Sequence, residues 1–339
     1  MDDKPDTGRP SSCWVVTDGR AGIENQALGL AEAVGRVENL TIMQKRISVR
    51  APWRKLPRVL WGDPFGKLTP DSARLGPPFP DLWIGCGRLS VPFTMAVKSA
   101  SPETFTVQLQ NPRAPASAFD LIIPPEHDGI EGENIFPIVG SPNRLSLQKL
   151  EQGKALLNAQ IAHLPMPRVA ILIGGPNGKA RINSTTADGL RQMVKEILEI
   201  GAGVMMTTSR RTPHLLMNAL APLKQHQNLF SFDPGMSENE TNPYFGILAH
   251  ADYLIVTEDS VNMTTEAAFT GKPLFTYNWQ GPNSDPISGK FGKFHQSLMA
   301  IGVTRPFKGS LEKGTPRLLD ETKRAALHVI NRWRVDKFQ

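Results

Sequence analysis

The sequence of 339 residues lacks the features that would assign it to an exported, membrane-spanning or metal-binding class. No apolar run approaches the roughly 18 to 20 residues that span a bilayer, and the acidic start MDDKPDTGRPSS has neither the positive nor the apolar region of a secretory signal. The two cysteines, Cys13 and Cys86, belong to no CxxC or Cys/His spacing, so neither a disulfide nor a zinc site is supported. We expect a cytoplasmic protein with buried free thiols.

The composition is that of a soluble globular protein. Apolar residues make up 40% and charged residues 21% of the chain, which supports well-packed cores and argues against extended disorder. At this length two domains are the natural expectation. The net charge of +6 favours an anionic partner.

Two segments of the chain repeat one pattern. A strand-like run at 12–17 opens into the glycine-containing turn 18–22 and a helical pattern, and the run at 168–173 opens into the turn 174–178 and another helical pattern. A strand, a glycine-rich turn and a helix form the opening unit of a doubly wound α/β domain. Strand-like segments then alternate with helical ones, at 82–85, 105–109 and 119–123 in the first half and at 203–207, 253–257 and 273–277 in the second. The pattern predicts two Rossmann-like doubly wound parallel-sheet domains facing each other across a cleft.

The domain boundary is expected between about 141 and 167, where a polar helix-like segment ends in HLPMPR. We predict an N-terminal domain over 11–150, a C-terminal domain over 165–315, and a final amphipathic helix within 318–339 that packs back on either domain.

A basic segment near the start of the chain is interleaved with aromatic residues. Residues 45–58 contain six bases and no acid. One interpretation is a solvated basic loop whose aromatic rings pack inward. The other is a peripheral membrane patch that places bases at anionic headgroups and rings at the interface; nucleic acid is a weaker third option, because no binding-module signature is present. The patch would consist of Trp53, Arg54, Lys55, Trp61 and Phe65.

Ligands of open parallel sheets bind beyond the carboxyl ends of the strands, and three unusual clusters lie at such ends in the second half. The turn 174–178 has little side-chain bulk, so a phosphate could approach its amides, although it is neither a Walker loop nor a full GxGxxG. The tract 207–213 combines hydroxyls with two arginines, the usual partners of a diphosphate. Ser260, Thr264 and Thr265 flank a helix start, where the alternative role of Ser260 is an ordinary N-cap. Glu266 is placed to accept hydrogen bonds from a ribose diol.

The segment from Glu266 to Pro273, EAAFTGKP, resembles the E-A-x-x-x-G-x-P signature of GT-B glycosyltransferases and sugar-nucleotide epimerases. Seven motifs together are similar to the mitochondrial fission Elm protein family: VVTDGRAGIENQALGLAEAVG, LWIGCGRLSVP, VQLQNPR, PPEHDG, ILIGGPN, TTSRRTP and VTEDSVNMTTEAAFTGKP. The resemblance covers about 13–277. Bacterial members of that family are commonly described as glycosyltransferases or nucleoside-diphosphate-sugar epimerases.

The resemblance implies a nucleotide-sugar site in the second domain and an acceptor site in the first. Asp18 is the first candidate for a base that removes the acceptor proton, His127 the second, and Glu24, Glu126 and Asp128 are further candidates. The implied nucleotide-sugar set is Gly174, Gly175, Asn177, Ser209, Arg210, Ser260, Thr264 and Glu266. The predicted acceptor or cleft set is Gly19, Arg20, Gly87, Arg88 and Asn111, with Gln110 and Arg113 beside them.

The resulting hypothesis is a GT-B glycosyltransferase that uses a nucleotide-diphosphate sugar and a lipid-linked or envelope acceptor at the cytoplasmic membrane face. No cofactor and no metal are expected, because there is no DxD pair to chelate a divalent ion. Two alternatives stay open. One is a non-catalytic membrane-associated scaffold of the mitochondrial-fission type, and the other is a UDP-sugar 2-epimerase.

Overall fold

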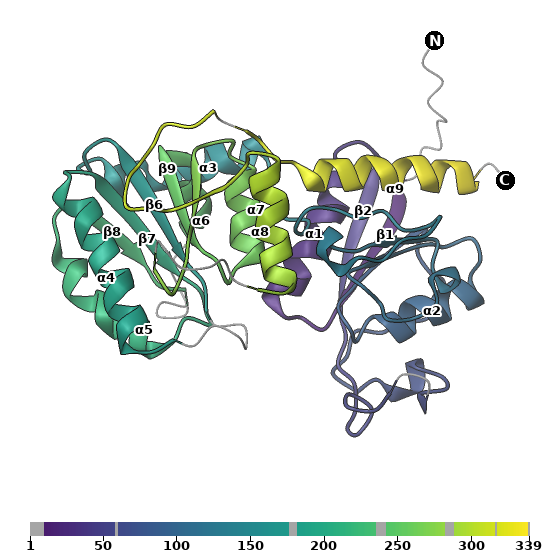
Figure 1. The fold of residues 1–339 in the computed structure, drawn as a ribbon. Helices are drawn as coiled ribbons and strands as arrows, with labels where there is room; N and C mark the ends of the chain where they lie inside the picture. Colours follow the sequence, from purple (N-terminus) through teal and green to yellow (C-terminus); the bar gives the residue numbers. More distant parts are fainter. Residues whose placement is uncertain are drawn as a thin grey trace, which may run out of the picture. The chain divides into compact units, whose positions relative to one another are not determined.

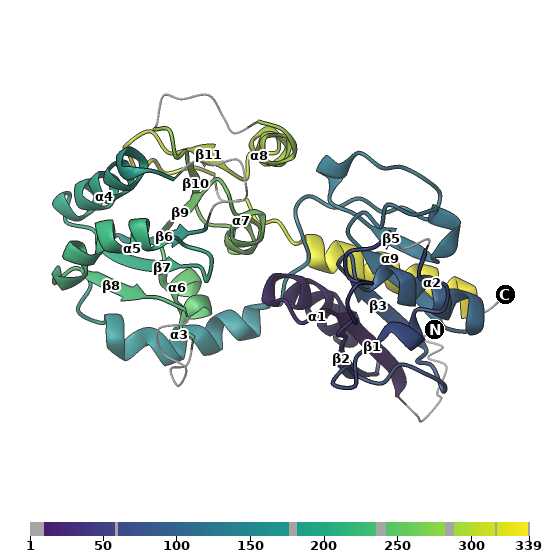
Figure 2. The same cartoon turned by 90° about the horizontal axis from the view of Figure 1, so that it is seen from below.

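The computed structural model describes residues 10–57, 60–175, 182–234, 242–281, 288–315 and 317–337. The chain divides into two compact units. Unit 1 contains Met1–Arg144 together with Glu321–Gln339, and unit 2 contains Leu145–Asp320. Figure 1 and Figure 2 show that the helix α9 (Glu321–Lys337), drawn in yellow, lies beside the purple and blue elements of unit 1.

The sheet of unit 1 is parallel, with strand order β2-β1-β3-β4-β5 among the described residues. Side chains of β1 alternate between its two faces: Cys13 and Val15 join the core under α1 and α9, whereas Trp14 and Val16 join a second core on the opposite face. The strands are β1 (Ser11–Thr17), β2 (Leu40–Arg46), β3 (Leu82–Cys86), β4 (Phe105–Leu109) and β5 (Leu121–Ile123). The other elements are α1 (Ala21–Gly35), η2 (Phe65–Lys67), α2 (Val91–Ala100), η3 (Ala116–Ala118) and η4 (Glu126–Asp128).

The sheet of unit 2 is also parallel, with order β11-β10-β9-β6-β7-β8 among the described residues. In Figure 2 the helices α4 and α5 lie on one face of this sheet and α3 and α6 on the other. The strands are β6 (Arg168–Ile173), β7 (Gly203–Thr208), β8 (Leu229–Phe232), β9 (Tyr253–Thr257), β10 (Leu274–Tyr277) and β11 (Arg305–Pro306). The helices are α3 (Leu147–Ile161), α4 (Ser184–Glu199), α5 (His214–Leu220), η5 (Ala221–Gln225), α6 (Tyr244–His250), α7 (Val261–Ala268) and α8 (Lys290–Ala300).

The predicted fold class, two parallel-sheet α/β units, is confirmed. The sequence did not predict β2, β8 and β11, because β2 is an edge strand with several exposed side chains and the other two are short. None of the helices that the described residues form combines the length and apolarity needed to cross a bilayer.

Two glycines allow α3 and α6 to approach closely. A Cβ atom at Gly153 would lie 2.7 Å from the amide nitrogen of Gly246, and one at Gly246 would lie 2.5 Å from the carbonyl oxygen of Gly153. Both distances are shorter than any ordinary contact, so larger side chains here would force the helices apart.

Candidate functional site

In unit 2 the turns that follow β6 and β9 are joined directly. The amide of Gly174 donates to Oγ1 of Thr257 over 2.8 Å. A Cβ atom at Gly174 would lie 2.2 Å from Oδ2 of Asp259, and one at Gly175 would lie 2.3 Å from the carbonyl oxygen of Arg211. Gly175 therefore requires glycine because the backbone of Arg211 approaches it, and a side chain at Gly174 would have to displace the Asp259 carboxylate, whether or not a phosphate binds there. Predicted residue Asn177 lies outside the described residues.

The turn after β7 completes the cluster. Oγ1 of Thr212 donates to the carbonyl oxygen of Gly174 over 2.6 Å and accepts from the amide of Ser209 over 2.8 Å. Thr212 is buried, whereas Arg210 is exposed and has no partner among the described residues. Three strand-end turns, those after β6, β7 and β9, are thus linked at the carboxyl edge of the sheet. We call them the three-turn cluster. The sequence placed Gly174, Ser209 and Arg210 at this edge but did not single out Thr212, whose hydroxyl connects the turns.

Two hydroxyls at the start of α7 serve the helix itself. Oγ of Ser260 accepts from the amide of Met263 over 3.3 Å, which is the ordinary N-cap considered as the alternative. Thr264 is 0% exposed, and its Oγ1 donates to the carbonyl oxygen of Ser260 over 2.8 Å. The prediction that Thr264 holds a diphosphate is therefore wrong for this conformation, because its hydroxyl is buried and its proton is engaged.

Glu266 is half-buried and is held by a residue that the sequence did not indicate. The hydroxyl of Tyr244, at the start of α6, donates to Oε2 of Glu266 over 2.7 Å. Burial raises the pKa of Glu266 to about 7, partly offset by this hydrogen bond. Burial also raises the pKa of Tyr244, and the neighbouring carboxylate adds to that effect. No local motif predicts this contact, since the partners are 22 positions apart.

The two acids after β9 support the turn. Oδ1 of Asp259 accepts from Nε1 of Trp279 over 2.8 Å, and Oε1 of Glu258 accepts from the amide of Trp279 over 3.3 Å. Burial raises the pKa of Asp259, although hydrogen bonds oppose the effect. Within the part of the chain that the structure describes, no group of three His, Cys, Asp or Glu side chains is arranged to hold a metal ion.

In unit 1 two of the carboxylates predicted as bases, Asp18 and Glu24, are engaged by arginines. Oδ2 of Asp18 accepts from Nε of Arg20 over 2.9 Å. Glu24 accepts from Nε and Nη2 of Arg46 over 2.7 and 2.9 Å, and this pairing lowers the pKa of Glu24. The contacts contradict a free general base at either position, because each carboxylate braces a turn or strand end through an ion pair. His127 lies half-buried on η4, beyond β5.

A cavity of about 1000 Å³ opens in unit 1 at the ends of β3 and β4. Three of the predicted acceptor residues, Gly87, Arg88 and Asn111, line it. Gly19 and Arg20 are not among its described lining residues, and the pair Asp18–Arg20 occupies the turn after β1 instead. We call this space the strand-end cavity.

The basic–aromatic segment packs its rings largely inward. Trp61 is only 3% exposed and meets Phe93 edge-on at 6.2 Å, so the prediction of Trp61 in a membrane patch is wrong. Phe65 is half-buried against Phe93 at 5.9 Å. Nζ of Lys67 lies 4.1 Å from the ring centre of Trp53. Arg54 and Lys55 are exposed.

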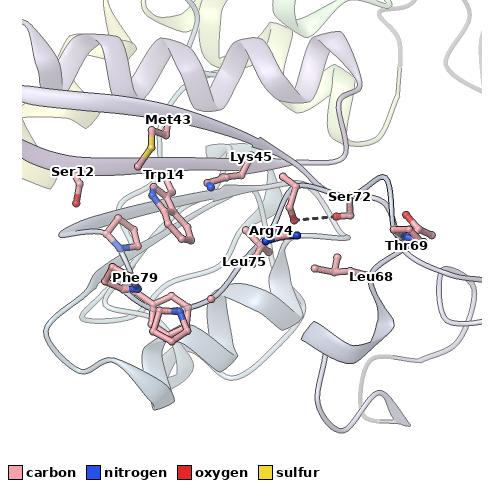
Figure 3. A pocket seen from close by; sticks show the side chains of 16 residues that line it. Ser12, Trp14, Met43, Lys45, Leu68, Thr69, Ser72, Arg74, Leu75 and Phe79 are labelled. Carbon is pink, nitrogen blue, oxygen red and sulfur yellow. Dashed lines mark hydrogen bonds between the residues drawn. The ribbon is translucent and has the colours of Figure 1, made fainter.

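Figure 3 shows the residues that line a second hollow, on the face of the sheet that carries Trp14. The volume of this hollow is about 730 Å³. Nζ of Lys45 lies 4.3 Å from the ring centre of Trp14, and Met43, Leu75 and Phe79 line the same space. Lys45, a base of the basic–aromatic segment, therefore stacks on the ring of Trp14 in the same unit. The arrangement agrees with the inward-packing interpretation for this part of the segment.

Sequence comparison matches residues 21–333 to the family described as Mitochondrial fission ELM1. The Mitochondrial fission protein ELM1 of Arabidopsis thaliana is 28% identical over 255 residues; the match covers 68% of this chain and spans only 58% of that relative. An uncharacterized protein of Rickettsia prowazekii is 27% identical over 362 residues, covering 92% of this chain and 96% of that protein.

Solved structures with a similar fold include two UDP-GlcNAc 2-epimerases. The enzyme from Neisseria meningitidis bound to UDP-GlcNAc aligns with a TM-score of 0.56 over 94% of this chain and 98% of its own. The enzyme from Methanocaldococcus jannaschii aligns with a TM-score of 0.54 over 94% of this chain and 99% of its own. Both are 12% identical to this chain, which shows a shared fold alone.

Proposed function

The chain belongs to the mitochondrial fission ELM1 family, and we propose that it binds a nucleotide-diphosphate sugar in unit 2 and transfers the sugar to an acceptor in unit 1. The observation that carries the proposal is the three-turn cluster, which joins the ends of β6, β7 and β9 around Gly174. The fold of a protein solved with UDP-GlcNAc supports the same placement. Ligands of open parallel sheets bind at this edge.

The residues of the three-turn cluster and of the neighbouring helix α7 would have distinct tasks. The exposed guanidinium of Arg210 would pair with the diphosphate in a charge-assisted hydrogen bond. The α7 N-terminus would favour the same negative charge. Glu266 would accept hydrogen bonds from the ribose hydroxyls, with Tyr244 holding the carboxylate in place. Gly174 and Gly175 would form the turn that allows the three strand-end turns to approach one another closely.

The transfer step needs stabilisation of a leaving group. An acceptor oxygen forms a bond to the anomeric carbon, and the bond from that carbon to the diphosphate oxygen breaks with its electron pair. The nucleoside diphosphate then carries additional charge, which Arg210 and helix-terminal amides would stabilise. We propose that this stabilisation replaces a divalent ion, so activity persists in chelator.

Nucleotide binding by unit 2 is tested with a panel of nucleoside diphosphates in thermal-shift and calorimetric titrations. Binding at about 100 times Kd adds roughly 2.7 kcal/mol to stability. Glu266→Ala should weaken binding, while Glu199→Ala, at an exposed position of α4, serves as the matched control. If no nucleoside diphosphate binds, the transferase proposal is refuted and the result favours the non-catalytic scaffold alternative.

The 2-epimerase alternative is favoured by the folds that align with this chain. Incubation with UDP-GlcNAc alone separates the two, because an epimerase forms the epimer without an acceptor. A transferase leaves the sugar unchanged until an acceptor is added.

We also propose that the acceptor lies at the cytoplasmic membrane face. The exposed side chains of Arg54 and Lys55 support this location, because bases near anionic headgroups contribute about 1 kcal/mol each. Salt-sensitive sedimentation with anionic liposomes should weaken in Arg54→Glu/Lys55→Glu. No sedimentation of the wild type at low salt would remove the membrane part of the proposal.

A further inference from the structure

The strand-end cavity joins two chemically different surfaces. Its apolar wall is formed by the α2 side chains Val91 and Met95 together with Trp61 and several prolines. Its rim carries Arg88 from the β3–α2 turn and Arg113 from the turn after β4. Both arginines are exposed, and none of the described lining residues is acidic. A ligand that fits both surfaces has an apolar body and an anionic end.

The floor of the cavity is held by a buried polar network. Gln108 is 0% exposed; its Oε1 accepts from Oγ1 of Thr94 over 2.9 Å, and its Nε2 donates to Oγ of Ser90 over 3.2 Å. Oγ1 of Thr94 also accepts from Nε1 of Trp83 over 3.0 Å. Because these partners tie β4 to the start of α2, the cavity has a preorganised floor.

The backbone at the end of β4 is strained where it lines the cavity. Gln110 and Arg113 have φ angles of 67° and 51°, in the left-handed region that side-chain-bearing residues rarely adopt. The side chain of Gln110 donates to Oε1 of Gln26 over 3.0 Å, and Oδ1 of Asn111 accepts from the amide of Arg113 over 2.9 Å. Such strain persists only where surrounding contacts maintain it, and it concentrates at ligand sites.

The lining also limits which acceptor oxygen could react. No described lining residue is a carboxylate or a histidine, and the predicted bases Asp18 and Glu24 are held in ion pairs. Among the described lining residues, a neutral hydroxyl acceptor would therefore find no carboxylate or imidazole to take its proton. A phosphate monoester needs none, because its second pKa is about 6 and its oxygens are deprotonated at neutral pH.

We propose that the strand-end cavity binds a phosphate-terminated amphiphile and that its phosphate oxygen is the nucleophile, an inference that rests on the proposed transferase function. The phosphate oxygen forms a bond to the anomeric carbon, the bond from that carbon to the diphosphate oxygen breaks, and the nucleoside diphosphate leaves with the electron pair. No proton is transferred. The product is a phosphodiester that joins the sugar to the amphiphile, and Arg88 positions the phosphate.

The experiment titrates the full chain, without nucleotide, with farnesyl phosphate, farnesol and inorganic phosphate. We expect farnesyl phosphate to bind at least tenfold more tightly than either of the others. Arg88→Gln should weaken farnesyl phosphate binding by about 10- to 100-fold, the range that hydrogen bonds to charged groups support, and should leave farnesol binding unchanged. Arg36→Gln, at an exposed position of the same unit, is the matched control and should bind as the wild type does.

Three results would overturn the inference: equal affinity for farnesol and farnesyl phosphate, equal affinity for inorganic phosphate, or an Arg88→Gln variant that is folded and binds normally. Circular dichroism of the variant separates loss of binding from loss of folding. Turnover with a nucleotide sugar that binds should release the nucleoside diphosphate and yield the phosphodiester by mass spectrometry; turnover with farnesol but not farnesyl phosphate would also refute it. If the chain binds farnesyl phosphate but no nucleotide, the proposed transferase function is refuted. The assignment of the cavity as a site for a phosphate-terminated amphiphile is then retained.

Discussion

Glu266 offers the sharpest test of the candidate site, because its protonation can be measured with and without ligand. Burial raises its pKa from an ordinary 4.5 to about 7 in the folded chain. A raised pKa in an acid means that folding favours the protonated form. The stabilising contribution is therefore fully present below about pH 4.5 and is lost as the pH rises through about 7.

The size of the effect follows from the shift. A difference of one pKa unit corresponds to about 1.4 kcal/mol, so the full shift would give roughly 3 kcal/mol. Because Glu266 is half-buried, solvent screening reduces this to about 2 kcal/mol. Between pH 5 and pH 8, which covers about three-quarters of this change, the wild type should lose about 1.5 kcal/mol of stability relative to Glu266→Gln. In a domain of 150–250 residues this corresponds to about 3 to 6 °C in melting temperature.

The assay is differential scanning calorimetry from pH 5 to pH 8 on the wild type, Glu266→Gln and the control Glu199→Gln. Glutamine keeps an acceptor for the Tyr244 hydroxyl but does not titrate. Parallel pH profiles for the wild type and Glu266→Gln would show that the carboxylate is not desolvated as described. If the ionised form binds the ribose, the affinity for a nucleoside diphosphate should also fall about tenfold from pH 8 to pH 6, since only about a tenth of Glu266 is ionised at pH 6.

Further predictions concern packing, the turns and the metal requirement. Gly153→Ala should destabilise unit 2 by more than about 1 kcal/mol in chemical denaturation, because the added Cβ would meet the backbone of Gly246; an unchanged midpoint would contradict the close helix contact. Thr212→Val should cost about 1 to 3 kcal/mol, since the carbonyl of Gly174 loses its buried donor, and Thr212→Ser should recover most of the loss. Glu24→Gln should leave the pH dependence of any transferase turnover unchanged, whereas loss of the acidic limb of the pH profile would restore Glu24 as the base. Turnover should survive dialysis against EDTA, and its recovery only with Mg²⁺ would refute the metal-independent proposal.

The fold could be predicted from the sequence wherever local patterns are strong. Buried β-branched runs such as 168–173 and 253–257 coincide with β6 and β9 because both faces of a central parallel strand are covered. The edge strand β2 was missed because its exposed side chains break the pattern. Gly174, Ser209 and Arg210 directly follow the strongly patterned strands β6 and β7, so their positions at the strand ends could also be predicted.

The partners of the candidate residues could not be predicted, because they depend on contacts between distant segments. Tyr244 reaches Glu266 from another helix, and Arg46 reaches Glu24, on helix α1, from strand β2. The sequence identifies an acid at a turn, but only tertiary packing decides whether the acid is free or paired. The burial of Trp61 is a further example. Trp61 is buried whereas Arg54 and Lys55 of the same segment are exposed, and only tertiary packing distinguishes them.

The helix α9 has a consequence for how this protein is made. Its residues Ala326, Val329, Ile330 and Trp333 complete the core that Cys13 and Val15 begin. During synthesis, the whole of unit 2 emerges from the ribosome before α9, because unit 2 is one continuous segment, whereas the first-made sheet waits for a helix encoded some 300 codons later. We therefore expect nascent chains that stop before α9 to hold a folded middle segment and an incomplete, chaperone-dependent beginning.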